Sequence, residues 1–136
     1  MRKVSLKTLV ATALAVVTMS VAVFANTLSF TDVSRITPET CWVSNKQEFQ
    51  NSGKHTVTAS FQKTYAKGTA YFKITKKFLG IHIAEAQTQI AITKGYSGIA
   101  VTSVLSGTVD GKKTRYYYIS GDDYADYKLS KFSDTY

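Results

Sequence analysis

The sequence contains little of the residues that define several protein classes. Its 136 residues include one cysteine, one proline and two histidines. A disulfide-stapled miniprotein and a cysteine-based zinc module need more cysteine, and a collagen-like or proline-rich fibre needs more proline. The length excludes a multidomain enzyme, because one domain takes about 100–200 residues. What the chain does contain is nine tyrosines and a basic excess, 17 Lys and Arg against nine Asp and Glu.

The first 25 residues have the layout of a secretory signal peptide. Three basic residues lie within the first seven positions, and an apolar stretch of 16 residues follows from Leu9 to Phe24. A membrane-spanning helix needs roughly 20 residues, so this stretch is short for an anchor. We therefore predict a signal peptide over residues 1–25, cleavage after Ala25, and a secreted mature chain.

The basic excess is uneven along the predicted mature chain. Residues 26–136 contain 14 bases and nine acids, a net charge of +5. Residues 121–136 hold four of the acids and two of the bases, so residues 26–120 carry 12 bases against five acids, or +7. A basic body with an acidic, tyrosine-rich tail favours an anionic partner. No recognition helix, zinc finger or RNA-binding aromatic signature accompanies the charge, so no specific nucleic-acid partner is predicted.

Alternation of apolar and polar residues is the clearest structural signal. Residues 56–65 alternate with period two, which is typical of a half-buried strand, and the pattern resumes over residues 70–78. A four-residue loop between the two segments would bring both apolar sets to one face of a hairpin. We therefore predict that hairpin, with Phe61 and Phe72 on the same side.

A second hairpin is predicted around Asp110-Gly111. These two residues separate residues 99–109 from residues 112–119, and Asp-Gly supplies the positive φ angles of a type I′ turn. Pairing Val109 with Lys112 places Tyr116 and Tyr118 on the apolar face. The same register places Arg115 and Tyr117 on the opposite face.

The remaining segments give weaker signals. Residues 81–93 favour a strand, residues 28–30 form a short strand, and Thr37-Pro38-Glu39 has the residue order of a short helix start. The tail, residues 121–136, is open between an edge strand and a frayed helix. Many strand signals with few helix signals predict an all-β fold, an antiparallel β-sandwich or small barrel of about 6–8 strands in a single domain over residues 26–136.

The residue types that most often carry chemistry form no known motif. The simplest interpretation of Cys41 is a buried, small apolar side chain, followed by an intermolecular disulfide and by a nucleophile paired with His55 or His82. Cys41, His55 and Glu48 are the least unfavourable set for a hydrolase. The cysteine and histidines lack a zinc spacing, and the acidic tail lacks the spacing of a calcium loop. We predict no catalytic residue, no metal site and no cofactor.

The outward positions of the two predicted hairpins combine cations with aromatic rings. Such a face binds phosphate, sulfate or carboxylate groups, although a solubilising β surface has a similar composition. We predict a secreted, non-catalytic β protein that associates with an anionic cell-envelope surface, polymer or membrane. The predicted binding residues are Tyr71, Lys73, Lys77, Lys113, Arg115 and Tyr117.

Two alternative functions come from other classes. The first is a bacteriocin-like or membrane-active toxin, in which the amphipathic segment Thr56–Lys77 would insert as a hairpin into a bilayer. The second is a small secreted ligand-binding protein or hydrolase built on the Cys41 set.

Overall fold

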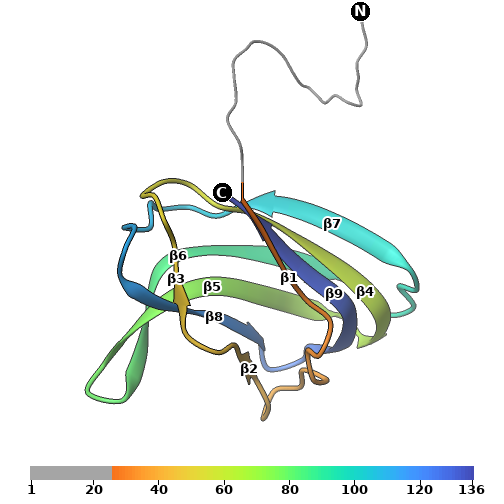
Figure 1. Cartoon of the computed structure of the whole chain (residues 1–136). Helices are drawn as coiled ribbons and strands as arrows, with labels where there is room; N and C mark the ends of the chain where they lie inside the picture. The colour runs from red at the N-terminus through yellow and green to blue at the C-terminus, as the bar shows by residue number, and fades with distance from the viewer. Residues whose placement is uncertain (1–25) are drawn as a thin grey trace, which may run out of the picture.

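The computed structural model describes residues 26–136, so the predicted signal peptide over residues 1–25 lies outside the described residues. Nine strands form two antiparallel sheets that face each other (Figure 1). The predicted all-β sandwich is therefore confirmed. A search of residues 26–136 finds no helix with the length and hydrophobicity needed to cross a bilayer.

The two sheets have four and five strands, and each includes strands from distant parts of the chain. The first sheet has the order β1-β9-β4-β7, and the second has the order β2-β8-β5-β6 with β3 also paired to β8. The first sheet consists of β1 (Thr27–Phe30), β9 (Asp126–Thr135), β4 (Thr56–Ala66) and β7 (Ile99–Val104). The second consists of β2 (Trp42–Val43), β3 (Gln47–Glu48), β8 (Thr114–Gly121), β5 (Gly68–Phe78) and β6 (Ile81–Ile92).

The predicted hairpin of residues 56–78 is wrong, because β4 and β5 belong to different sheets. Only Lys67 separates them, and the chain changes sheet there. Gly68 permits the close turn, since a Cβ at this position would lie 2.8 Å from the backbone nitrogen of Ala125. Phe61 and Phe72 are nevertheless both fully buried. They enter the same core from opposite sheets rather than from one face of a hairpin.

The hairpin predicted around Asp110-Gly111 is also wrong. β7 pairs with β4, whereas β8 pairs with β5, so residues 105–113 connect the two sheets. The residue with positive φ in this turn is Lys112, at 60°, and not Gly111. The inward positions of β8 are therefore the odd-numbered ones, the reverse of the prediction.

A two-residue hairpin does join β5 and β6. Phe78 pairs with Ile81, and the two residues between them, Leu79 and Gly80, have φ angles of 51° and 79°. Two consecutive positive φ values are the requirement of a type I′ turn. Because β8 pairs with β5 only from Ala70 to Thr75, the end of this hairpin extends beyond the rest of the sheet, at the lower left of Figure 1.

The acidic tail is an interior part of the first sheet. β9 lies between β1 and β4. Both structures predicted for residues 121–136, an edge strand and a frayed helix, are therefore wrong. The region of Thr37-Pro38-Glu39 forms a tight turn instead of a helix. In that turn the amide of Thr37 donates a hydrogen bond to Thr40 Oγ1 at 2.9 Å.

The core fills the space between the sheets with aromatic and aliphatic side chains. Phe72 of the second sheet stacks on Phe132 of the first, with ring centroids 5.6 Å apart and an interplanar angle of 7°. Tyr117 meets Phe132 edge to face at 5.5 Å. Such ring pairs add about 0.5–1.5 kcal/mol each beyond the area they bury. With its inner side filled, the second sheet presents only its outer surface to a partner.

Candidate binding surface

The outer surface of the second sheet gathers lysine and tyrosine side chains from three adjacent strands. The register brings Lys73 of β5 opposite Tyr118 of β8, and Lys77 of β5 opposite His82 of β6. We refer to the set as the cation–tyrosine face; it consists of Tyr71, Lys73, Lys77, His82, Tyr116 and Tyr118.

The lysines of this face lie against tyrosine rings. Lys73 Nζ is 5.8 Å from the ring centroid of Tyr71 and 5.9 Å from that of Tyr118. Lys77 Nζ is 5.6 Å from the ring centroid of Tyr116. Distances within about 6 Å allow cation–π attraction, which holds the ammonium groups along the sheet while they stay open to water.

His82 lies between the two tyrosines of β8. Its ring centroid is 5.1 Å from that of Tyr116 and 5.3 Å from that of Tyr118, and its Nδ1 is 2.8 Å from Thr75 Oγ1. Partial burial and the positive charge of Lys77 lower the pKa of His82 below its ordinary 6.5. At neutral pH the positive charge of the face therefore comes from its lysines.

The three strands that form the face carry one carboxylate, and it is engaged elsewhere. That group is Glu85 of β6, whose oxygens accept hydrogen bonds from Arg115 Nε at 2.5 Å and Arg115 Nη2 at 3.0 Å. These hydrogen bonds hold the pKa of Glu85 below its ordinary value. Within β5, β6 and β8, Lys73 and Lys77 thus have no acidic side chain to neutralise them.

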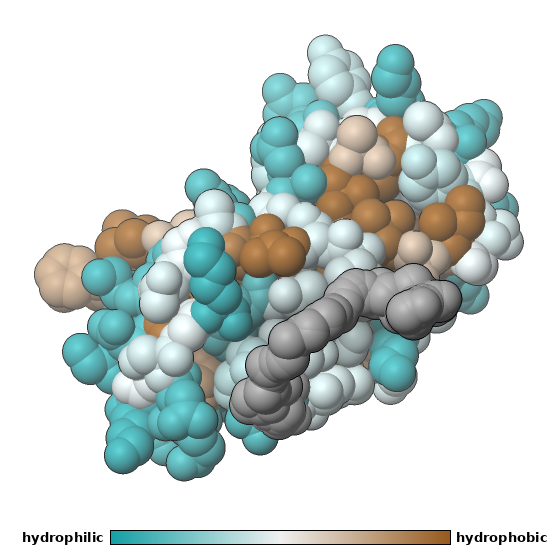
Figure 2. All heavy atoms as spheres, turned by 90° about the horizontal axis from the view of Figure 1, so that it is seen from above, coloured by the Kyte–Doolittle hydropathy of each residue, from teal (hydrophilic) through white to brown (hydrophobic). Residues whose placement is uncertain are grey.

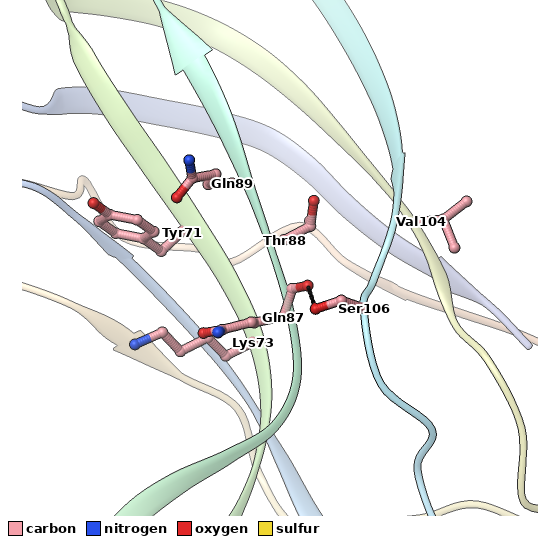
Figure 3. Close-up of a pocket in the computed structure, with 7 residues that line it drawn as sticks. All are labelled: Tyr71, Lys73, Gln87, Thr88, Gln89, Val104 and Ser106. Atoms are coloured by element: carbon pink, nitrogen blue, oxygen red, sulfur yellow. Dashed lines mark hydrogen bonds between the residues drawn. The ribbon is translucent and has the colours of Figure 1, made fainter.

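A hollow adjoins the cation–tyrosine face at each of its two ends. Figure 3 shows one of about 440 Å³, in which Tyr71, Lys73, Gln87 and Gln89 extend to the same side of β5 and β6. Amide groups beside a cation and an aromatic ring offer hydrogen bonds to sugar hydroxyl and anionic groups alike.

The second hollow, of about 390 Å³, lies at the opposite end of the face, beside the β5–β6 hairpin. Its lining includes Lys76, Lys77 and Lys113, together with the Arg115–Glu85 pair. Asp110 Oδ2 is 4.0 Å from Lys113 Nζ, and both side chains are exposed. Exposed pairs of this kind contribute little, so Lys113 stays available to a stronger anion.

Of the six residues predicted from the sequence, four lie on the outer surface of the second sheet or beside it. Tyr71, Lys73 and Lys77 share the cation–tyrosine face, and Lys113 lines the adjoining hollow. The other two, Arg115 and Tyr117, are wrongly predicted as water-facing. The Arg115 side chain is only 7% exposed against Glu85, and Tyr117 is fully buried.

The sequence does not predict two residues of the face, Tyr116 and Tyr118. They are neighbours in β8 of the misplaced residues Arg115 and Tyr117. The wrong hairpin inverted the two sides of β8, and the sequence Tyr-Tyr-Tyr at positions 116–118 gives no composition difference that would reveal the inversion. An alternative signal was Ile119, a strongly apolar residue whose inward position fixes the odd-numbered side of β8 as buried.

Tyr117 belongs to a polar network closed inside the core. Asp134 Oδ2 lies 2.5 Å from His55 Nδ1 and accepts a hydrogen bond from the hydroxyl of Tyr117, and all three residues are fully buried. Burial and the nearby Asp134 raise the pKa of Tyr117 far above its usual range. His55 Nε2 and Asp134 Oδ1 have no hydrogen-bond partner. Being closed to solvent, this network holds the two sheets together and cannot meet a substrate.

Cys41 is exposed, which corrects the interpretation of a buried thiol. Its contact with the Tyr118 hydroxyl raises the pKa of that tyrosine. His55, by contrast, packs in the core against Phe49 and Tyr136, with ring centroids 4.6 and 4.7 Å away. The structure therefore does not bring together the set considered for a hydrolase.

Three of the four acidic residues of the tail have structural partners: Asp134 in the core network, and Asp122 and Asp126 nearer the surface. Asp122 accepts hydrogen bonds from the backbone amides of Thr69, Tyr124 and Ala125, which lower its pKa against the effect of burial. Asp126 forms a two-hydrogen-bond ion pair with Arg35 at 2.7 and 2.8 Å. Among residues 26–136, no three His, Cys, Asp or Glu side chains gather closely enough to hold a metal ion.

Comparison with protein-family models, with curated proteins and with solved structures finds no match to this chain. The functional argument therefore depends on the geometry of the chain itself.

Proposed function

We propose that this chain is a secreted, non-catalytic β-sandwich protein that associates with an anionic cell-envelope surface or polymer through its cation–tyrosine face. The observation that carries the proposal is the alignment of Lys73 and Lys77 against tyrosine rings on a sheet surface free of unpaired carboxylates. Lys113, beside Lys77 in the adjoining hollow, extends the cationic area.

The chemistry of the face suits repeated anionic groups on a surface or polymer. Ammonium groups attract phosphate or carboxylate oxygens, and tyrosine hydroxyls donate hydrogen bonds to the same oxygens. The tyrosine rings offer flat apolar area on which a sugar or a polymer backbone packs. A face that spans three strands contacts several repeats at once, whereas a single small anion would use only one lysine.

The expected strength of this association is modest. One lysine near an anionic surface contributes about 1 kcal/mol, so Lys73, Lys77 and Lys113 together give roughly 3 kcal/mol. A dissociation constant of about 1 mM corresponds to 4.1 kcal/mol. Charge alone would therefore hold a single site only weakly, and salt would weaken it further. Occupancy on an envelope depends on many anionic groups within reach of one molecule.

The experiment is co-sedimentation of the mature protein with purified cell envelopes over a salt series. A face variant combines Lys73→Gln, Lys77→Gln and Lys113→Gln. Its matched control combines Lys54→Gln, Lys94→Gln and Lys131→Gln, three exposed lysines outside the face, so that both variants lose the same net charge.

We expect wild-type protein and the control to bind at low salt and to dissociate at high salt, and the face variant to bind poorly throughout. Retention of wild-type protein at high salt would contradict an electrostatic association. Equal losses in the two variants would show that net charge, rather than this face, determines binding.

A further inference from the structure

The β5–β6 hairpin ends in large apolar side chains that are exposed to solvent. Phe78, Leu79 and Ile81 are 62%, 86% and 65% exposed, and Ile83 is also exposed. We refer to these four residues as the apolar tip. Figure 2 shows hydrophobic atoms at the projecting left end of the molecule, the end at which the β5–β6 turn lies in Figure 1. A contiguous apolar patch of this kind marks an interaction site.

The apolar tip is held in a defined conformation. The β5–β6 register continues without a break from the Thr75–Ala84 pair to the Phe78–Ile81 pair, and the type I′ turn closes it. Inter-strand hydrogen bonds then satisfy much of the backbone near the turn, which lowers the free-energy cost of moving it out of water. A short two-stranded hairpin of this length reaches into one layer of a bilayer and does not span it.

Cationic side chains lie directly behind the apolar tip. Lys76 and Lys77 precede Phe78 in β5, and Lys113 lines the same hollow as these two lysines. A strand rises about 3.4 Å per residue, so Lys76 and Lys77 stand roughly 3–7 Å behind Phe78. An apolar end followed at this distance by a cationic collar matches the boundary between acyl chains and anionic headgroups.

We infer that the apolar tip inserts into the surface layer of an anionic lipid bilayer, while Lys76, Lys77 and Lys113 contact the headgroup phosphates. The inference rests on the proposed function and narrows its anionic surface to a lipid. A second copy of this chain is a poorer occupant, because pairing two tips would bring two lysine collars together. Insertion also supplies the affinity that the lysines alone lack.

The test compares binding to vesicles of phosphatidylglycerol and of phosphatidylcholine. The tip variant combines Phe78→Ser with Leu79→Asn, because asparagine tolerates the positive φ of residue 79. Its control is Tyr124→Ser, which removes a large side chain that is 74% exposed in the connection between β8 and β9, away from the face and its two hollows. Neither variant alters a buried contact, and circular dichroism verifies that both are folded.

We expect wild-type protein and Tyr124→Ser to bind anionic vesicles and to bind neutral ones far less. The tip variant should bind anionic vesicles at least tenfold more weakly, given the apolar area of two large side chains. A Phe78→Trp variant should show a blue-shifted emission on binding that brominated lipids quench. Wild-type protein, whose only tryptophan is Trp42 of β2, is the control for that signal.

Binding to immobilised polyphosphate separates failure of the inference from failure of the proposed function. If wild-type and tip variant bind vesicles equally, or if wild-type binds polyphosphate but no vesicle, the lipid inference is overturned and the proposed function stands. If wild-type binds neither polyphosphate nor vesicles, both are overturned.

Discussion

Replacement of Asp134 by alanine tests whether the closed polar network holds the two sheets together. Asp134 lies on β9 of the first sheet, and its hydrogen-bond partner Tyr117 lies on β8 of the second. The substitution leaves the Tyr117 hydroxyl and His55 Nδ1 buried without a partner. Each unsatisfied buried group costs about 1–3 kcal/mol, and the loss of one partner of a buried pair costs about 3–5 kcal/mol in total.

That loss is large against the whole stability of a domain of this size. Total free energies of unfolding are about 5–15 kcal/mol, so Asp134→Ala should remove roughly a fifth or more of the total. At about 4 °C per kcal/mol, the melting temperature should fall by on the order of 15 °C. The Tyr117→Phe variant, which removes one hydroxyl and leaves Asp134 paired with His55, should lose only about 1–2 kcal/mol.

The assay is urea unfolding followed by near-ultraviolet circular dichroism, with thermal unfolding as a second measurement. An Asp134→Ala variant that loses less than about 1 kcal/mol would refute the reasoning, because it would mean that the buried groups find water or other partners. A Tyr117→Phe variant that loses as much stability as Asp134→Ala would also refute the reasoning. It would mean that the Asp134–His55 hydrogen bond contributes nothing beyond the Asp134–Tyr117 hydrogen bond.

Four further predictions concern single residues. Glu85→Gln should lower the melting temperature at pH 7 and lower it progressively less as the pH falls below 4.5. The stability that comes with a lowered carboxyl pKa is fully present above the ordinary value of 4.5 and is lost as pH falls through the lowered pKa; a pH series of melting curves measures this. His82 has a pKa below its ordinary 6.5, so wild-type binding to anionic vesicles should strengthen as the pH falls below that value and the ring gains a proton, and His82→Gln should flatten that part of the binding profile relative to wild-type. Gly68→Ala should destabilise the fold by about 1–3 kcal/mol in urea unfolding, since its Cβ would meet backbone atoms at 2.8–2.9 Å, whereas Gly53→Ala, with open space around it, serves as the control. Cys41 should react with a thiol reagent as quickly in native protein as in urea, and a protected thiol would contradict its exposure.

Along most of β4 and β5, alternation identified which side chains point inward but not which strands pair. Val57, Ala59 and Phe61 on β4 and Phe72 and Ile74 on β5 are all buried, as a period of two predicts. The same side chains of β4 and β5 would be buried whether the two strands paired in one sheet or faced each other from two sheets. The alternation pattern therefore cannot distinguish a hairpin from a connection between sheets. The turn residues misled as well, because Asp110-Gly111 looked like a hairpin turn and Leu79-Gly80 did not.

The candidate surface was predictable in part for the same reason. Tyr71, Lys73 and Lys77 follow from the alternation of β5 alone, whereas the choice between Tyr117 and its neighbours needed the true register of β8. The apolar tip was hidden in a different way. Phe78-Leu79-Gly80-Ile81 has the composition of a buried segment, and only its place beyond the last β5–β8 pair, at Thr75, shows that nothing covers it.

The most direct test of the central claim is an NMR titration of residues 26–136 with polyphosphate, which reports which face meets the polyanion. The account predicts that the largest amide shifts fall on β5 and β8, at Tyr71, Lys73, Tyr116 and Tyr118, and that they disappear when salt is added. Shifts concentrated on the lysines of the first sheet, such as Lys63 and Lys131, or spread evenly over the basic surface, would contradict it.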